Sequence, residues 1–531
     1  MFPILDLAKL HEAVRYEGGV SRRLFLAYAA GLSALPWLGS AARARTKRVA
    51  FSDDPFALGI ASGDPSPSGV VLWTRLAPKP LEFGGGLEPE NLEVSWEIAA
   101  DESMRRVVRR GTAVAIPQLG HSVHVEAEGL EPDRWYWYRF RAGDAESPVG
   151  RTRTLPQKNS SPPELRFAVA SCQHYEQGLY TAYEHMARDE LDLVLFLGDY
   201  IYEGGGDVHR TRTHAGREIM TLEDYRIRHA QYKTDPLLQA MHARCPWVVT
   251  WDDHEVDNNY ANDICEHEQV DPVDFLFRRA NAYQAYYENM PLRRESVPSG
   301  PNMQLYRKLS FGQLAEFMVL DTRQYRTNQP NYDGQTDINE AALSPEATML
   351  GAKQRNWVEK SLTASPAKWN VFAQQVMMGM VDIAPGDVRK YWMDEWPGYV
   401  YERQQLVKFL EDQQIANPIV LTGDYHANWV NNLRVDDRHD DTPVIATEFV
   451  GTSISSEGNG VDKPRNHAAI LAENPCVQFM NEQRGYILCT VTDGAWQSDY
   501  RIVPYVNKPG APVTTRASFV VEAGRTGAKQ I

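Results

Sequence analysis

The chain has 531 residues, of which 43% are hydrophobic and 24% charged, and its formal net charge is −15. A chain of this length is too long to fold around a single hydrophobic core, so we expect at least two domains. The acidic balance argues against a nucleic-acid-binding surface, and a protein of this charge that acts on an anionic substrate needs local positive charge, which bound metal ions provide.

The N-terminus has the pattern of an export signal. SRRLFL (21–26) fits the twin-arginine motif, an apolar stretch runs over 24–38, and ARA (42–44) is a small-x-small cleavage site. We predict a signal peptide over 1–44 that the twin-arginine export machinery recognises, and a periplasmic or secreted location. That route carries folded proteins, often with an inserted cofactor. The apolar stretch is shorter than the ~20 residues of a membrane-spanning helix, so no stable membrane span is predicted; a retained anchor is the alternative.

Residues 50–155 have the pattern of a β domain. Short apolar runs alternate with turn residues, as in SGVVLWTRL, LEVSWEIAA and WYWYRFRAG, and no helical period is present. This spacing predicts a small β-sandwich of the immunoglobulin or fibronectin kind. The polar, proline-containing segment 157–164 is then a linker.

Residues 165–515 alternate between strand-like and helix-like segments. The apolar runs are LRFAVAS, LDLVLFLGD, PWVVTWDD, FMVLDTRQ, WNVFAQQV and NPIVLTGD. Helix-like segments, such as 274–290 and 400–415, lie between several of them. This alternation is typical of an α/β catalytic domain.

Polar side chains that bind metals follow directly after these apolar runs. In α/β sheets, ligands bind at the carboxyl ends of the strands. Four strand ends would therefore bring Cys172, Asp199, Asp253 and Asp424 into one cleft.

Each cluster has a chemical interpretation and a plainer alternative. In GDYIYE, Asp199 and Tyr202 offer a carboxylate and a phenol, which suit Fe(III); the alternative is an ordinary turn. WDDHEVDNN places His254 among four acids after an apolar run, a pattern that a solvated loop explains poorly. In GDYHANW, Asp424 and His426 can reach one binuclear centre, or form a turn. Cys172 is either a metal ligand or a small core residue. The chain has five cysteines, which cannot all form disulfides with one another, and the sequence does not determine which of them pair.

Taken together, the clusters resemble the calcineurin-like metallophosphatase superfamily and, within it, the PhoD-like alkaline phosphatase and phosphodiesterase family. The superfamily uses G-D-x-x, G-N-H-[DE] and G-H-x-H after successive strands. Here the corresponding segments are GDYIY, DDHE and GDYH, and SCQ replaces the opening aspartate motif. LGIASGDPSPSGVVLWTRLAP and LDTRQYR also match the PhoD-like branch. The resemblance implies a layered α/β/β/α catalytic domain.

The resemblance also implies iron and calcium as cofactors. Sorting the ligands by softness assigns Cys172, Asp199, Tyr202 and His426 to Fe(III), and Asp199, Asp253 and Asp424 to Ca²⁺. Asn258 is a weaker candidate for a further calcium contact. The implied mechanism is attack on phosphorus by a metal-bound hydroxide. In it, His254 protonates or stabilises the leaving group, and Arg323 either binds phosphate oxygens or forms a buried structural ion pair.

We therefore expect an exported hydrolase that releases phosphate from small phosphomonoesters, phosphodiesters or both. One alternative is a phospholipase D-like diesterase that acts on lipid headgroups or cell-wall polymers. The other belongs to a different class, a secreted calcium-binding adhesion protein. The sequence leaves the natural substrate and the oligomeric state open.

Overall fold

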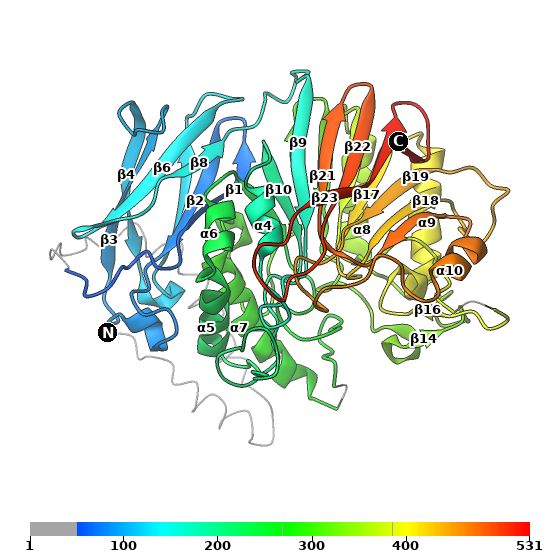
Figure 1. Cartoon of the computed structure of the whole chain (residues 1–531), viewed down its shortest axis with the longest axis horizontal. Helices are drawn as coiled ribbons and strands as arrows, with labels where there is room; N and C mark the ends of the chain where they lie inside the picture. The colour runs from blue at the N-terminus through cyan, green and yellow to red at the C-terminus, as the bar shows by residue number, and fades with distance from the viewer. Residues whose placement is uncertain (1–49, 268, 385) are drawn as a thin grey trace.

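The computed structural model describes residues 50–267, 269–384 and 386–531, and the structural statements below concern this part of the chain (Figure 1). The predicted signal peptide, residues 1–44, lies outside the described residues. No helix among the described residues is long and apolar enough to cross a membrane.

The larger of the two main sheets has ten strands in the order β24-β23-β22-β21-β9-β10-β11-β1-β2-β5. Its centre is formed by three parallel strands, β9 (Glu164–Ala170), β10 (Leu193–Leu197) and β11 (Trp247–Thr250). Their residues are nearly all buried and apolar, as expected for parallel strands covered on both faces. The other strands are β1 (Ile60–Ser66), β2 (Gly69–Arg75), β5 (Ser122–Glu128), β21 (Arg484–Thr492), β22 (Ala495–Val503), β23 (Thr514–Glu522) and β24 (Lys529–Gln530).

The second sheet has seven strands in the order β12-β13-β15-β17-β19-β18-β20. Four neighbours in its middle run parallel: β13 (Ala315–Val319), β15 (Trp369–Ala373), β17 (Pro418–Thr422) and β19 (Ala446–Val450). Antiparallel strands complete its edges, namely β12 (Arg307–Phe311), β18 (Asn428–Leu433) and β20 (Val477–Asn481).

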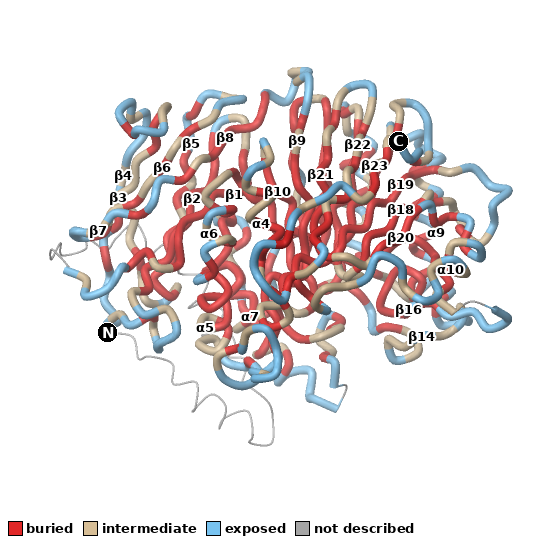
Figure 2. Tube along the Cα trace, viewed as in Figure 1, coloured by how far each residue is buried: buried red, intermediate tan, exposed pale blue. Residues whose placement is uncertain are grey.

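The two sheets face each other across a shared apolar core. Phe167 and Leu195 of the first sheet belong to the same buried cluster as Phe317 and Val371 of the second. The opposite face of each sheet is covered by helices, and the strands of both sheets are mostly buried (Figures 1 and 2). The helices on the ten-stranded sheet are α4 (Thr181–Met186), α5 (Leu222–Lys233), α6 (Pro236–His242) and α7 (Pro272–Asn289). Those on the seven-stranded sheet are α8 (Gly351–Thr363) and α9 (Val400–Asp412).

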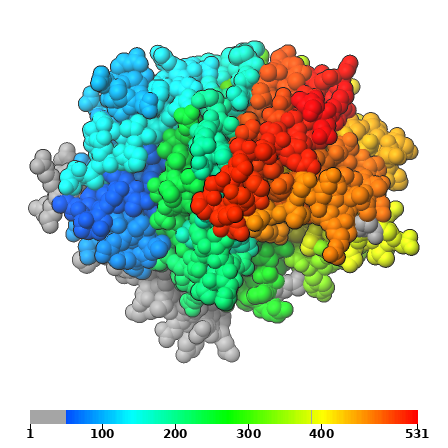
Figure 3. Space-filling view, viewed as in Figure 1, coloured from blue at the N-terminus to red at the C-terminus, as the bar shows by residue number. Residues whose placement is uncertain are grey.

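The N-terminal strands form two sheets around their own core, as in a sandwich, but one of these sheets is not self-contained. β1 pairs in parallel with β11 through Gly63 and Trp247, so β1, β2 and β5 extend the ten-stranded sheet. In Figure 3 the blue and cyan surface of these residues adjoins the green surface of the α5–α7 region. The facing sheet contains β3 (Leu92–Ala99), β4 (Val107–Ala115), β6 (Trp135–Ala142), β7 (Ala145–Glu146) and β8 (Gly150–Arg153).

Three short elements lie outside these layers. β14 (Gln335–Thr336) and β16 (Tyr391–Trp392) form a small antiparallel pair, and α10 (His467–Glu473) precedes β20. All five cysteines are buried and none is in a disulfide.

Candidate functional site

The predicted site residues lie on loops at the carboxyl ends of parallel strands from both main sheets. Cys172 follows β9, Asp199 follows β10 and Asp253 follows β11. Asp424 and His426 follow β17 of the second sheet. Three overlapping groups have side-chain ligand atoms within 4.8 Å of one another: Cys172, Asp199 and His426; Asp199, Asp253 and His254; and Asp252, Asp253 and Asp424. The structure thus joins clusters that are far apart in sequence.

The backbone turns sharply at four of these residues. Their φ angles are +57° at Cys172, +58° at Asp199, and +55° at both Asp424 and His426. This left-handed region costs a residue other than glycine roughly 1–2 kcal/mol. Such residues cluster at functional sites, where the surrounding structure holds them in place. Here the turns aim side chains from different loops at a common centre.

Glu255 holds two of the loops together. Its carboxylate accepts hydrogen bonds from the backbone N–H groups of Asp199, Tyr200 and Asp252. The loops also approach closely at Gly198, where a Cβ atom would lie 2.4 Å from the Cβ of Asp252. Glu255 is absent from the predicted site residues, although it stands in the same DDHE segment, because its role depends on a partner loop that the sequence pattern does not identify.

Tyr202 links the members of the first group. Its hydroxyl donates to Asp199 Oδ2 at 2.8 Å and lies 3.1 Å from His426 Nε2. Burial raises the pKa of the Tyr202 hydroxyl and of the Cys172 thiol well above their usual values, and the Asp199 carboxylate raises both further. A phenolate and a thiolate can therefore form here only beside a strong positive charge, which a metal ion supplies.

The carboxylates of the other two groups also fit a cation. Asp199 Oδ1, Asp252 Oδ2 and Asp253 Oδ1 are buried without a hydrogen-bond partner among the described residues. Burial raises the pKa of Asp252 and Asp424 well above the ordinary range, and neighbouring carboxylates add to the rise. Buried, unpaired oxygen atoms are costly, and an all-oxygen set is the kind that a hard cation binds.

His254 is held by a carboxylate from a neighbouring loop. Its Nδ1 lies 2.7 Å from Glu203 Oε2, and its ring packs 4.1 Å from the ring of Tyr202. Burial by itself lowers the pKa of His254, but Glu203, Asp253 and Asp199 outweigh burial and raise it well above its ordinary value. The histidine therefore sits beside the acidic centre with one nitrogen already occupied.

Arg323, which follows β13, is fully buried and paired with carboxylates. Its Nε donates to Asp252, and its Nη1 donates to Asp394 Oδ1 at 2.8 Å. Its Nη2 has no hydrogen-bond partner among the described residues and lies 3.8 Å from Asp253 Oδ1 and 3.9 Å from Asp424 Oδ1. This geometry favours the buried ion pair over phosphate binding as the role of Arg323.

Asn258 has partners other than the predicted ligands. Its backbone N–H donates to Glu203 Oε1 at 3.0 Å, and its side-chain amide donates to Glu266 Oε1 at 2.9 Å. The next residue, Asn259, donates its backbone N–H to Asp253 Oδ2 at 2.7 Å. A ligand role for Asn258 stays a prediction.

Asp394 is a second charged residue that the predicted site omits. It accepts hydrogen bonds from Arg323 and Arg326 and is itself buried. Two aromatic side chains of the same segment, Trp396 and Tyr399, are fully buried. Asp394 follows no strand of either main sheet, so a search at strand ends does not find it.

The fold and this centre define an α/β enzyme with a metal-binding cluster of carboxylate, histidine and cysteine side chains. Two family models match the chain: the N-terminal domain of PhoD-like phosphatase over residues 40–156, and PhoD-like phosphatase over residues 167–500. The chain belongs to the PhoD-like phosphatase family and is a phosphoric ester hydrolase.

Two relatives support this assignment. The chain is 52% identical over 486 residues to alkaline phosphatase D of Bacillus subtilis (strain 168), covering 91% of this chain and 83% of the relative. A solved structure described as the structure of PhoD superposes with a TM-score of 0.89 at 51% identity, covering 91% of this chain and 93% of that one. The predicted family is therefore confirmed, and an enzyme is favoured over the adhesion protein.

Proposed function

We propose that the protein is an exported, metal-dependent phosphatase that releases phosphate from small phosphomonoesters, phosphodiesters or both, and so serves phosphate scavenging. The observation that carries this proposal is the convergence of Cys172, Asp199, Asp253, Asp424 and His426 at the strand ends of two sheets. Asp199 and Asp253 each have a buried oxygen atom without a hydrogen-bond partner among the described residues, and the other three residues and Asp199 have left-handed backbones. Both features are costly and are typical of functional sites.

The donor set supports iron and calcium as the metals. We assign Fe(III) to Cys172, Tyr202 and His426 with Asp199, because thiolate, phenolate and imidazole suit a trivalent transition metal. We assign Ca²⁺ to the carboxylates of Asp199, Asp253 and Asp424, with Asn258 as a further contact and Asp252 adjacent. When bound, the metals supply positive charge for phosphoryl oxygens and lower the pKa of water.

His254 acts on the leaving group in this proposal. Glu203 engages Nδ1, which fixes the ring orientation and leaves Nε2 as the nitrogen that serves a substrate oxygen. Packing against Tyr202 restricts the ring further. His254 thereby stabilises or protonates the departing alkoxide, and Glu203 is its positioning residue.

Arg323 acts through its contacts with the carboxylates of the site. Because it pairs with Asp252 and faces Asp253 and Asp424, it offsets part of their mutual repulsion and holds them in place. Phosphate binding by its Nη2 is the second role, and the thermal stability of Arg323→Met distinguishes the two roles.

Export, the domain division and the layering belong to the same proposal. The N-terminal family match over 40–156 and the catalytic match over 167–500 support an N-terminal domain over 50–155 and a catalytic domain over 165–515. The shared core between the sheets supports the α/β/β/α layering of the metallophosphatase superfamily. The twin-arginine segment supports a periplasmic or secreted location.

The test is hydrolysis of p-nitrophenyl phosphate and its bis-ester by the purified protein, with and without added Ca²⁺. We expect turnover of at least one ester, stimulation by Ca²⁺, and loss of turnover in Asp199→Asn. Exclusive turnover of the bis-ester, together with release of headgroups from phospholipids, would favour the phospholipase D-like alternative. No turnover of either ester under any metal condition would contradict the proposal.

A further inference from the structure

A short segment of the loop that follows β19, with the sequence SSEG, lies against the predicted iron ligands. Ser456 Oγ donates to the backbone oxygen of Cys172 at 2.8 Å and lies 2.7 Å from the hydroxyl of Tyr202. Glu457 Oε1 lies 3.5 Å from Nδ1 of His426. The segment therefore contacts three of the four residues assigned to iron, although no sequence motif marks it as part of the site.

The two ring nitrogens of His426 face different partners. Nε2 lies 3.1 Å from the hydroxyl of Tyr202 and 3.9 Å from Asp199 Oδ2, so this nitrogen faces the other predicted iron ligands. Nδ1 faces the carboxylate of Glu457. A histidine that binds a metal usually places its second ring nitrogen against a carboxylate, a backbone oxygen or water, which fixes the ring and makes it a stronger donor. Glu457 occupies the position of such a partner.

The backbone of Glu457 has a conformation that favours glycine. Its φ angle is +63°, and those of Gly458 and Gly460 nearby are +70° and +67°. This left-handed region is costly for a residue with a side chain. The side chain of Glu457 is 66% exposed, and an exposed ion pair contributes little to stability. A glutamate at this position therefore costs conformational energy without a matching gain in stability, which is typical of a residue with a functional role.

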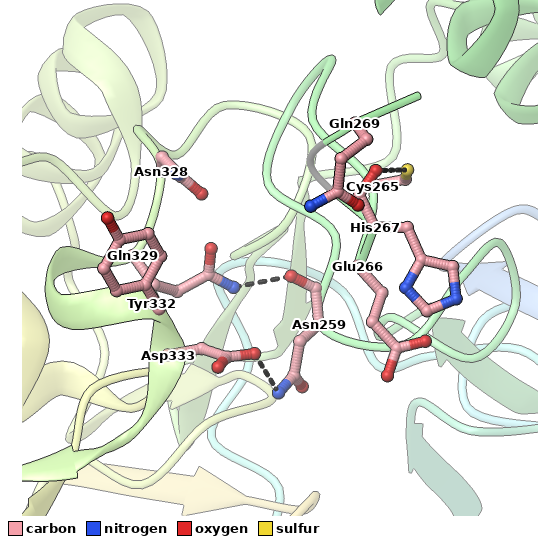
Figure 4. A pocket seen from close by; sticks show the side chains of 9 residues that line it. All are labelled: Asn259, Cys265, Glu266, His267, Gln269, Asn328, Gln329, Tyr332 and Asp333. Atoms are coloured by element: carbon pink, nitrogen blue, oxygen red, sulfur yellow. Dashed lines mark hydrogen bonds between the residues drawn. The ribbon is translucent and has the colours of Figure 1, made fainter. Parts of the chain in front are cut away.

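The outer contacts on the carboxylate side of the centre differ in kind. Asn259 donates its backbone N–H to Asp253 Oδ2 at 2.7 Å. Gln329 donates its side-chain amide to the backbone oxygen of Asn259 at 2.6 Å (Figure 4) and to Asp394 Oδ1 at 2.7 Å. Carboxylates accept hydrogen bonds, so uncharged N–H donors suit them, whereas an imidazole that binds a metal through one nitrogen carries an N–H on the other and needs an acceptor. Each side of the centre therefore has outer partners that match its own ligands.

We propose that Glu457 is a positioning residue of the iron site, which holds Nδ1 of His426 so that Nε2 faces Asp199 and Tyr202, and thereby strengthens the binding of Fe(III). The inference rests on the iron assignment in the proposed function. The thiolate, phenolate and carboxylate of the predicted ligand set match a trivalent cation. The carboxylate of Glu457 adds a further negative charge next to the one neutral ligand of that set.

The test measures how well the purified holoenzyme retains iron against increasing concentrations of the chelator desferrioxamine, by atomic absorption and by the visible tyrosinate–Fe(III) band. We expect Glu457→Gly to release half of its iron at a roughly 10- to 100-fold lower chelator concentration than the wild type, the usual cost of losing such an outer partner. Glu457→Gln keeps a neutral acceptor and should fall between the two. Because His426 then donates less strongly and the iron accepts electrons more readily, the band should also move to longer wavelength.

Both variants should fold, because glycine adopts the φ angle of Glu457 readily and glutamine has the length of glutamate. Glu482→Gln is the matched control. Glu482 lies close enough to Glu457 for their charges to repel each other, but it forms no ion pair with His426 among the described residues. This control should retain iron nearly as well as the wild type does.

An active, iron-containing wild type whose Glu457 variants retain iron equally well, with an unchanged band, overturns this inference alone. Equal iron loss in Glu482→Gln and Glu457→Gln also overturns it, since negative charge would then act without the contact to His426. A wild type that hydrolyses p-nitrophenyl phosphate without holding iron overturns the metal assignment together with this inference. Absence of turnover of every ester contradicts the proposed function itself.

Discussion

Replacing Arg323 by methionine distinguishes the two roles considered for this residue. Arg323 is fully buried, donates to Asp252 and Asp394, and faces Asp253 and Asp424. Removing one partner of a buried ion pair leaves uncompensated charge and costs about 3–5 kcal/mol. The unfolding entropy is about 2.1 cal/mol/K per residue, so for a chain of this length about 1 kcal/mol lowers the unfolding midpoint by about 1 °C. We therefore expect Arg323→Met to lower the midpoint by about 3–5 °C.

The assay is thermal unfolding of the purified protein followed by circular dichroism, with metal content measured on the same samples. Arg403→Met is the matched control, because Arg403, on α9, forms an equally buried ion pair with Asp437, and neither residue belongs to the metal-binding groups. Both variants should lose stability, but only Arg323→Met should also lose metal. An Arg323→Met protein with an unchanged midpoint and metal content, and only a raised KM for phosphate esters, would refute the structural role and support phosphate binding.

Three further predictions follow from contacts around the site and from one distant histidine. Glu255→Ala leaves three backbone N–H groups without an acceptor, so it should lower the unfolding midpoint by a few degrees, at about 1–3 kcal/mol per unsatisfied group, and also reduce bound metal. The control is Glu402→Ala, which removes an acceptor for two backbone N–H groups remote from the centre and should lower stability without metal loss. Metal loss in both Glu255→Ala and Glu402→Ala would contradict the role of Glu255 in holding the metal site. Glu203→Gln should lower kcat/KM about 10- to 100-fold for alkyl phosphates but much less for p-nitrophenyl phosphate, whose leaving group needs little protonation; equal losses would exclude action through His254. Burial lowers the pKa of His124 to about 4, so as the pH falls from about 6.5 the unfolded chain takes up a proton before the folded one does and stability declines. His124→Gln should therefore lose less thermal stability between pH 7 and pH 4.5 than the wild type, and an identical decline would contradict this reasoning.

The strands that carry the site are predictable because buried strands have a recognisable local sequence pattern. LRFAVAS, LDLVLFLGD and PWVVTWDD correspond to β9, β10 and β11, since parallel strands covered on both faces appear as continuous apolar runs. The helix expected over 274–290 is observed as Pro272–Asn289, and that over 400–415 as Val400–Asp412. Once strand ends are known, the positions of the candidate ligands follow from sheet geometry alone.

What the sequence does not predict depends on long-range partners. The pairing of Gly63 with Trp247, which joins the N-terminal strands to the main sheet, has no local signal. Within the predicted β domain, β4 has only a weak local signal, because just one of its nine residues is buried and RRGT interrupts its apolar pattern. Asp394 is buried by tertiary contacts with other loops, so its sequence neighbours do not mark it as part of the site. Glu255 stands in a predicted cluster, but the loop whose N–H groups it accepts is not predictable from that segment.

The visible absorption spectrum of the purified protein tests the metal assignment most directly. If Tyr202 binds Fe(III), the protein has a charge-transfer band, and Tyr202→Phe removes that band. Cys172→Ser should lose most of the iron. Tyr425→Phe alters the tyrosine of the second Gly-Asp-Tyr triplet and should leave the band intact. A colourless, iron-free and fully active wild-type enzyme, or a band that survives in Tyr202→Phe, would contradict the account.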